Sequence, residues 1–311
     1  MTRGETRMVP EVETTSYYGR PIVKAPVWAA TDIAGYIFLG GLAGASSLLA
    51  AGAQATGRPA LARVGKVAAL GGISLSAVAL VHDLGRPERF ANMLRVFKPT
   101  SPMSMGSWLL AAYGPAAGLA AITDVSGLLP RVGRTATAGA ALLGPAVATY
   151  TAVLFADTAV PAWHEGHREL PFVFAGSAAS AASGLALLAT PPGQAGPARR
   201  TAIGGAVVEL AAARRMRARM GVVAETYRRG RAGRLIRAAE VLTAAGALGA
   251  AVSGARTVGP TARRITAAAA GAALLAGSVC TRFGVFAAGM ASARDPRYTV
   301  IPQRERLAAR T

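Results

Sequence analysis

The sequence contains little cysteine, few acidic residues and few aromatic residues. Its single cysteine, Cys280, excludes a disulfide scaffold. It also excludes an iron–sulfur cluster held by this chain alone, because such a cluster needs about four thiolate ligands. Only 16% of the 311 residues are charged, against about 25% in soluble domains. With 52% hydrophobic residues and a mean hydropathy of +0.37, the composition indicates an integral membrane protein.

The charge is strongly unbalanced, with 34 Lys and Arg against 15 Asp and Glu, a formal net charge of +19. Such a charge is compatible with nucleic acid or with a membrane surface. The basic residues lie between apolar runs instead of forming one stripe, and no zinc-knuckle or aromatic-rich RNA motif accompanies them. This distribution argues against a nucleic-acid partner and favours contact with membrane lipid.

Histidine is also scarce, which bears on haem and metal binding. A transmembrane haem needs axial ligands, most often two facing His residues. The three His are His82, at the end of an apolar run, and His164 and His167, in a short loop. No two of them lie in facing apolar runs, and the loop pair has no third His or Cys nearby. We therefore expect no haem and no metal site.

Long apolar runs separated by Gly- and Pro-rich breakers dominate the chain. A helix needs about 20 apolar residues to cross the hydrocarbon layer of a membrane. The runs predict an all-α membrane protein with eight transmembrane helices. Their approximate ranges are 27–53, 61–82, 104–123, 135–160, 170–190, 200–220, 234–254 and 265–292. The sixth range is the weakest, because its uninterrupted apolar part ends at Ala213 and contains Glu209.

An even number of spans places both termini on one side, which we call the terminal side. Of the 34 Lys and Arg, 22 fall in terminal-side segments and 10 in segments of the opposite side. Many of the 22 come from the arginine-rich stretch 214–234. By the positive-inside rule, this asymmetry predicts a multi-pass protein of the cell membrane with both termini in the cytoplasm.

Ionisable side chains within the spans gather in the terminal-side half of the membrane. Each such group costs about 2.5–3.5 kcal/mol on insertion scales and by default marks function. One interpretation is a polar pocket with a partial proton route. The other is structural pairing, with Glu209 or Glu240 neutralising Arg282. The candidates for either role are Asp157, Glu209, Glu240 and Arg282. Tyr150 and Asp157, seven residues apart, are expected to share a helix face.

The segment after the second span is basic and partly apolar. Its cationic residues are Arg86, Arg89, Arg95 and Lys98. Alone, these residues are compatible with a loop that binds lipid headgroups or with a docking surface for a soluble partner.

Several stretches resemble the membrane-subunit family of polysulfide reductase and NrfD. They are Tyr36-Ile37-Phe38-Leu39-Gly40-Gly41, the His-Asp-Leu-Gly-Arg-Pro run 82–87, the stretch 98–108, Tyr150-Thr151, Leu170-Pro171-Phe172, Glu209, Arg282-Phe283 and the tail 295–304. The motifs in 82–108 are fairly specific, whereas the glycine-rich helix motifs are weak alone.

The resemblance implies two four-helix bundles and a quinone or quinol site that faces an iron–sulfur subunit with four clusters. That subunit would connect to a molybdopterin catalytic subunit, as in anaerobic respiration. The chain itself would carry no haem or cluster. It would be a non-catalytic or quinone-reactive subunit, with menaquinone as the expected quinone. The resemblance and the depth of the polar groups together give the candidate quinone residues Trp28, Asp32, Tyr36, His82, Asp83, Trp108 and Tyr150.

Within this set we expect Tyr150 to donate a hydrogen bond to one quinone carbonyl and Asp32 or His82 to serve the other. Asp83 would orient His82, whose ordinary pKa lies near neutrality. The expected division is a polar segment 1–26, a quinone-binding bundle 27–160, a second bundle 161–292 and a polar tail 293–311. Two alternatives stay open, namely a polytopic transporter and a structural anchor without a quinone site.

Overall fold

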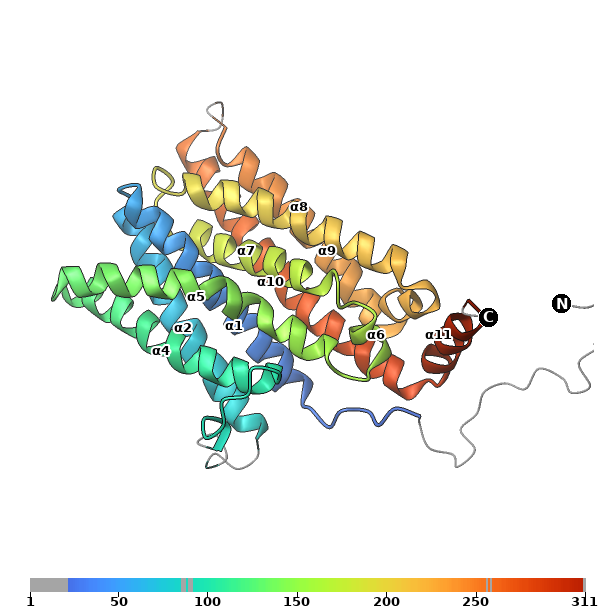
Figure 1. The fold of residues 1–311 in the computed structure, drawn as a ribbon. Coiled ribbons are helices and arrows are strands. Elements are labelled where there is room, and N and C mark those ends of the chain that lie inside the picture. Colours follow the sequence, from blue (N-terminus) through green and yellow to red (C-terminus); the bar gives the residue numbers. More distant parts are fainter. Residues whose placement is uncertain (1–21, 85–87, 89–91, 256, 258, 310–311) are drawn as a thin grey trace, which may run out of the picture.

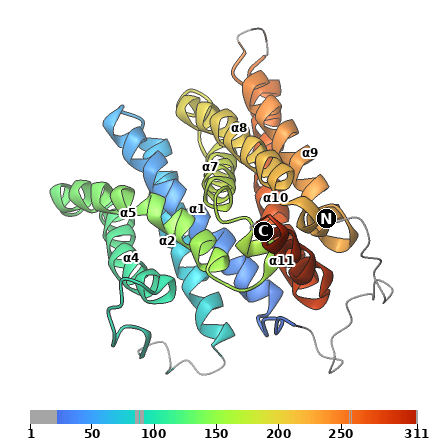
Figure 2. The same ribbon diagram turned by 45° about the vertical axis from the view of Figure 1, so that its right-hand side comes forward.

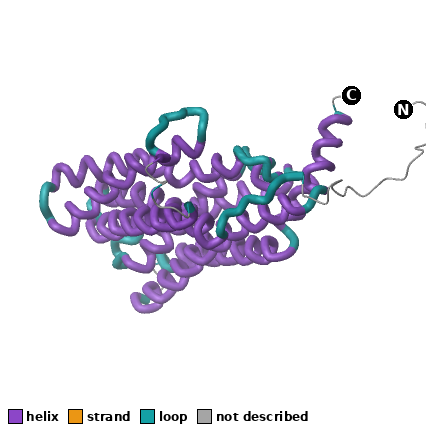
Figure 3. Tube along the Cα trace, turned by 90° about the horizontal axis from the view of Figure 1, so that it is seen from below, coloured by secondary structure: helices purple, strands orange, loops and turns teal. Residues whose placement is uncertain are grey.

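The structure is a computed structural model, which describes residues 22–84, 88, 92–255, 257 and 259–309. Throughout this described part the chain forms helices joined by loops (Figures 1 and 3). Its long helices are α1 (Ala30–Ala55), α2 (Pro59–Asp83), α4 (Pro102–Ser126), α5 (Pro130–Ala156), α7 (Leu170–Ala189), α8 (Gly196–Arg219), α9 (Gly230–Val252) and α10 (Pro260–Arg294). Three short helices, α6 (Pro161–His164), η1 (Gly221–Tyr227) and α11 (Arg297–Ala308), lie between or after them.

Proline sets the start of several of these helices. Pro59, Pro102, Pro130 and Pro260 are the first residues of α2, α4, α5 and α10. The first helical position suits proline, because its N–H would have no partner there and its φ angle already matches the helix. The breakers in the sequence therefore define helix starts closely.

Seven of the eight long helices are long and apolar enough to cross a membrane, and α8 is the exception. The predicted sixth span does form a helix, but arginines occupy both ends of its sequence and shorten its apolar part. Two other helices differ from their predicted ranges. Helix α10 covers 35 residues instead of the range 265–292. Helix α5 ends at Ala156 instead of at residue 160, so Asp157 lies beyond the helix and is exposed.

Helix α1 lies at the centre of the molecule. It packs against α2 and α5 on one side and against α7 and α10 on the other. Figure 2 shows α2, α4 and α5 on one side of α1 and α8 and α9 on the other. Helices α7 to α10 pack mainly among themselves. The chain is thus a helical membrane protein whose two halves meet at α1 and α7.

Glycine permits a close helix contact within the first half. A Cβ atom on Gly44 of α1 would collide with the backbone carbonyl oxygen of Gly144 of α5, and the reverse also holds. Small residues allow this approach, which helices in lipid need because association there depends on packing. The contact fixes the distance between α1 and α5, which also limits the space between these two helices at their ends.

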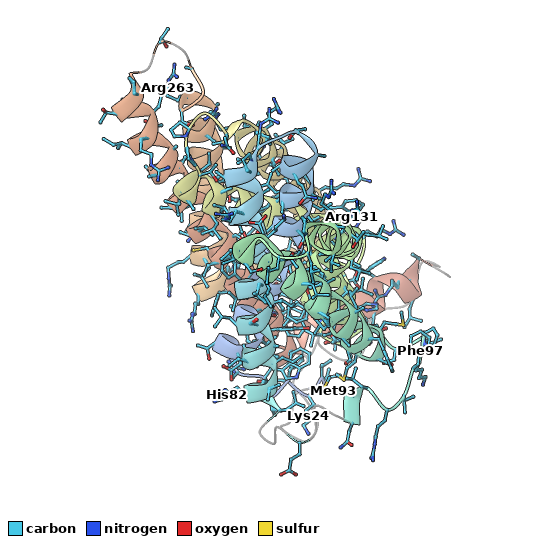
Figure 4. All side chains as sticks on the ribbon, turned by 90° about the vertical axis from the view of Figure 1, so that its left-hand side faces the viewer. Lys24, His82, Met93, Phe97, Arg131 and Arg263 are labelled. Atoms are coloured by element: carbon cyan, nitrogen blue, oxygen red, sulfur yellow. The ribbon has the colours of Figure 1, made fainter. Side chains whose placement is uncertain are left out.

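An ion-pair cluster ties α1, α2 and α4 together at the end away from the termini. Lys66 is buried, and its Nζ donates to Asp124 Oδ1 at 2.8 Å and to Gln54 Oε1 at 2.7 Å. Arg63 Nε donates to Asp124 Oδ2 at 2.9 Å. Figure 4 shows the opposite end, where His82, Met93 and Lys24 gather far from Arg263. The ion-pair cluster and His82 therefore lie at opposite ends of the molecule. The described termini lie at the end with His82.

Candidate functional site

A cavity of about 310 Å³ opens between α1, α2, α4 and α5 at the terminal-side end. Its walls are mostly apolar, and its position matches the half of the membrane in which the sequence places the polar residues. The lining residues are Trp28, Ile33, Tyr36, Ile37, Leu80, Asp83, Leu84, Met93, Met103, Gly106, Ser107, Leu110, Tyr150, Leu154 and Phe155. An apolar pocket with a few polar groups is the usual form of a small-molecule site.

The hydroxyl of Tyr150 is the most informative group in this cavity. Its oxygen is shielded from solvent and has no hydrogen-bond partner among the described residues. Native proteins rarely leave a buried hydroxyl unpaired, because this costs about 1–3 kcal/mol. A ligand with a hydrogen-bonding oxygen would satisfy this hydroxyl.

Gly106 of α4 makes room for the Tyr150 ring. A Cβ atom at this position would lie 2.5 Å from Tyr150 Cε2 and 2.9 Å from Cδ2. Only glycine therefore lets the ring lie flat against α4 without displacement. The position of the Tyr150 hydroxyl depends on this contact between α4 and α5.

Asp83 contributes the carboxyl group of the cavity lining. It ends α2, and its Oδ1 accepts a hydrogen bond from the backbone N–H of Ala29 at 3.2 Å. This bond ties the chain before α1 to the end of α2 and closes the cavity on that side. The carboxylate can accept further hydrogen bonds through its second oxygen.

Of the seven candidate residues, Trp28, Tyr36, Asp83 and Tyr150 line the cavity. Asp32 and His82 lie outside the lining and pair with each other, with Asp32 Oδ2 and His82 Nδ1 at 2.8 Å. The His82 side chain is 78% exposed. The expectation that Asp83 orients His82 is therefore wrong, because Asp32 on α1 provides that contact and Asp83 is bonded to Ala29.

Trp108, the seventh candidate, also lies outside the cavity lining. Its Nε1 donates to the backbone oxygen of Val96 at 3.3 Å, and its ring meets Phe97 edge to face. Ser104 Oγ donates to the same Val96 oxygen at 2.8 Å. Trp108 thus holds the loop before α4 in place.

The predicted docking residues are divided between described and undescribed parts of the chain. Arg95 and Lys98 are exposed next to the Trp108 contact. Arg86 and Arg89 lie outside the described residues. The exposed cations thus lie in the described segment just before α4, a few residues after Met93, which lines the cavity.

Three stacked aromatic rings form the wall behind the cavity. The Trp28 ring lies 6.0 Å from Phe155 and 5.8 Å from Trp163, and Phe155 and Trp163 are 4.3 Å apart. Trp163 is buried, and its Nε1 donates to the backbone oxygen of Val285 at 2.9 Å. The stack therefore joins the segment before α1 to α5, α6 and α10.

The intramembrane charges of the second half do not form the ion pairs of the second interpretation, in which Glu209 or Glu240 neutralises Arg282. Arg282 Nη2 donates to the backbone oxygen of Phe174 at 2.8 Å, and its guanidinium lies 3.8 Å from the centre of the Phe174 ring. Glu209 Oε1 accepts from Thr281 Oγ1 at 2.6 Å. Glu240 pairs instead with Arg217. Among the described residues, Arg282 makes no salt bridge within 4.0 Å, although it and Glu209 are both buried.

A salt bridge outside the spans fixes the loop before α7. Buried Glu169 receives hydrogen bonds from Arg219 Nε at 3.0 Å and Nη2 at 2.8 Å. The Arg219 guanidinium holds the pKa of Glu169 below its usual range, and Arg215 adds to this effect. The pair stabilises the terminal-side end of the second half.

Sequence reasoning missed most of the apolar lining. Met93, Met103, Ser107, Leu110 and Leu154 lie in the cavity wall, but their residue types are also those of ordinary packing. Only the position of Met103 and Ser107 in the sequence could have identified them, because both fall within the motif stretch 98–108. Gly106 was in that stretch too, and only the Tyr150 ring shows why glycine is there.

Comparison with protein families gives one match. The family described as "Polysulphide reductase, NrfD" matches residues 23–192. The matched part extends from just before Trp28 to just after α7 and contains every residue of the cavity lining. Comparison with curated proteins found no match.

Proposed function

Because the chain belongs to the NrfD family of polysulphide reductase membrane proteins, we propose that its cavity binds the head of a quinone. The family and the seven apolar helices make it a multi-pass membrane subunit of a respiratory oxidoreductase. The observation that carries the proposal is the buried Tyr150 hydroxyl on an apolar cavity, for which the described residues offer no hydrogen-bond partner. A quinone has the carbonyl oxygens that this hydroxyl needs and a flat ring that suits the apolar walls.

Each lining residue has a definite task in this proposal. Tyr150 donates a hydrogen bond to one carbonyl oxygen, and Gly106 keeps its ring in place. Asp83, held by Ala29, accepts a hydrogen bond from the other oxygen when that oxygen carries a proton. Trp28 and Phe155 provide flat apolar surface and exclude water. The bound quinone supplies two-electron, two-proton chemistry, and electrons reach it from a partner because the chain carries no redox group of its own in this proposal.

Protons are exchanged on the terminal side. His82 directly precedes Asp83 in the sequence, is largely exposed and pairs with Asp32 at 2.8 Å. In this proposal the exposed pair takes up protons from solvent, and Asp83 passes them to the cavity. We assign Arg282 and Glu209 a structural role, because Arg282 is held by the Phe174 carbonyl and ring.

The partner is an iron–sulfur subunit that docks over the cavity mouth, with a molybdopterin subunit behind it. Arg95 and Lys98 are exposed on the loop beside the mouth and would attract an acidic partner surface. In this arrangement α8 is the eighth membrane span, and the two halves of the molecule are two four-helix bundles.

The test is to fill the cavity. Leu154 lines it, whereas Leu142 on the same helix is 81% exposed to the surroundings. We expect the complex purified from quinone-rich membranes to contain quinone, measured by chromatography of an organic extract. The Leu154→Trp variant should lose it, and the Leu142→Trp variant should keep it. Retention of quinone by Leu154→Trp, or its absence from the wild-type complex, would contradict the proposal.

A further inference from the structure

A second cavity, of about 480 Å³, lies on the other side of the aromatic wall. It is formed by η1, the start of α9, the end of α10 and α11, and we call it the arginine-rimmed cavity. Trp28 lines both cavities, so its ring separates them. The second cavity has no part in the proposed quinone chemistry, and the following inference does not depend on that chemistry.

The floor of the arginine-rimmed cavity is apolar and belongs to the membrane-spanning part of the chain. Phe283, Phe286 and Met290 line it from α10, on successive turns of the helix. Helix α10 is one of the seven candidate spans and ends at Arg294. These side chains therefore lie in the last turns of a candidate membrane helix.

Arginines form the rim of this cavity, at the start of α9 and the end of α10. Arg229 and Arg231 lie beside the first residue of α9, and Arg294 is the last residue of α10. All three are exposed. Arg229 pairs with Glu225 at 3.0 Å, whereas Arg231 and Arg294 have no hydrogen-bond or ion-pair partner among the described residues. Two uncompensated guanidinium groups thus border an apolar cavity.

This arrangement matches the chemistry of an anionic phospholipid. The guanidinium group binds phosphate oxygens through paired N–H donors. Basic pockets between helices at a membrane surface hold anionic headgroups. We infer that the arginine-rimmed cavity binds one anionic phospholipid, with its phosphate at Arg231 and Arg294 and an acyl chain along Phe283, Phe286 and Met290. The bound lipid would also support the outer face of Trp28.

The test uses the fluorescence of Trp28 in the full-length protein. Phosphatidylglycerol with brominated chains should quench the tryptophan emission at low concentration, and brominated phosphatidylcholine should need at least a tenfold higher concentration. The Trp28→Phe variant should lose this quenching, which would locate the lipid. Equal quenching by both lipids would overturn the inference, because any acyl chain would then fill the cavity.

The arginines are tested with a charge-matched pair of double variants. Arg231→Gln with Arg294→Gln should weaken phosphatidylglycerol binding about 25-fold, at about fivefold for each arginine. Arg234→Gln with Arg304→Gln removes the same charge from exposed positions outside the cavity and should leave the binding unchanged. Equal weakening in both double variants would show only a general charge effect and would refute the site.

Two competitors distinguish the other possible occupants. Inorganic phosphate carries the charge without the chains and should not displace the brominated lipid. Saturating menaquinone should fill the first cavity and leave the amount of brominated phosphatidylglycerol that co-purifies with the protein unchanged, measured by mass spectrometry because quinones themselves quench tryptophan emission. Displacement by either compound would overturn the inference. If the double variant fails to fold, the single Arg294→Gln variant and the comparison of the two lipids on the wild-type protein still test whether the cavity binds an anionic phospholipid.

Discussion

Replacing Tyr150 by Phe should separate ligand binding from stability, because the hydroxyl has no partner within the described protein. In the ligand-free chain this change removes a buried hydroxyl that makes no hydrogen bond. An unpaired buried hydroxyl lowers the free energy of unfolding by about 1–3 kcal/mol. The Tyr150→Phe variant should therefore unfold at the same temperature as the wild type or above it. Its affinity for quinone should nevertheless fall.

The size of this loss follows from one hydrogen bond. A neutral hydrogen bond contributes about 0.5–1.5 kcal/mol net, which corresponds to about a 2- to 13-fold weaker Kd. At a quinone concentration of about 100 times the wild-type Kd, binding stabilises the wild type by about 2.7 kcal/mol. A tenfold loss of affinity reduces this to about 1.4 kcal/mol. The quinone-dependent rise in Tm should therefore shrink by about half.

Tyr113 provides the matched control. Its hydroxyl is buried, lies 2.7 Å from Ser47 Oγ and donates to the backbone oxygen of Ala43 at 2.7 Å. Side-chain hydrogen bonds between membrane helices contribute about 0.6 kcal/mol on average and up to about 1.7 kcal/mol. Tyr113→Phe should therefore lower Tm without changing the Kd for quinone, the opposite of the pattern expected at Tyr150.

The assay is thermal unfolding of the detergent-solubilised protein with and without quinone, together with a binding titration of each variant. An unchanged Kd in Tyr150→Phe would remove this residue from the site. Equal loss of affinity in both variants would show that the effect comes from general destabilisation. Either result would refute the reasoning from the unpaired hydroxyl.

Three further predictions concern other parts of the molecule. Gly106→Ala should weaken quinone binding, because its Cβ would displace the Tyr150 ring. Overpacking costs about 1–3 kcal/mol and the helix propensity gained offsets about 1 kcal/mol, so the variant should lose no more than about 2 kcal/mol of stability; a Kd like that of the wild type would contradict the contact. Glu169 has a pKa lowered by Arg219, so its contribution to stability is full above the unfolded pKa and is lost as pH falls through the folded one. The Tm of the wild type should therefore drop more between about pH 5 and pH 3 than that of Glu169→Gln, and parallel curves would argue against the pair. A reporter fused after residue 311 should be active in the cytoplasm, as the arginine asymmetry predicts; an external reporter would reverse the orientation and the side of the partner.

The sequence by itself determined the class of the protein and the positions of its helices. Apolar runs of about 20 residues have few alternatives to helices in lipid, because the backbone must satisfy its own hydrogen bonds there. Prolines such as Pro102 and Pro130 then defined the starts. The motif stretches pointed to the family that the match over residues 23–192 shows. The motif stretches and the depth of the polar groups also identified the four candidate quinone residues that line the cavity.

The tertiary structure decided which of the polar groups meet. Residue depth along a helix can be counted from the sequence, but the direction of each helix face depends on packing against its neighbours. For this reason Asp32 was found with His82 instead of in the cavity lining, and Arg282 with the Phe174 carbonyl instead of with an acidic residue. The contact of Gly106 with the Tyr150 ring joins α4 to α5 through residues that are about forty positions apart in the sequence. Such contacts arise only when the helices pack, because nothing in the local sequence of either helix specifies the other.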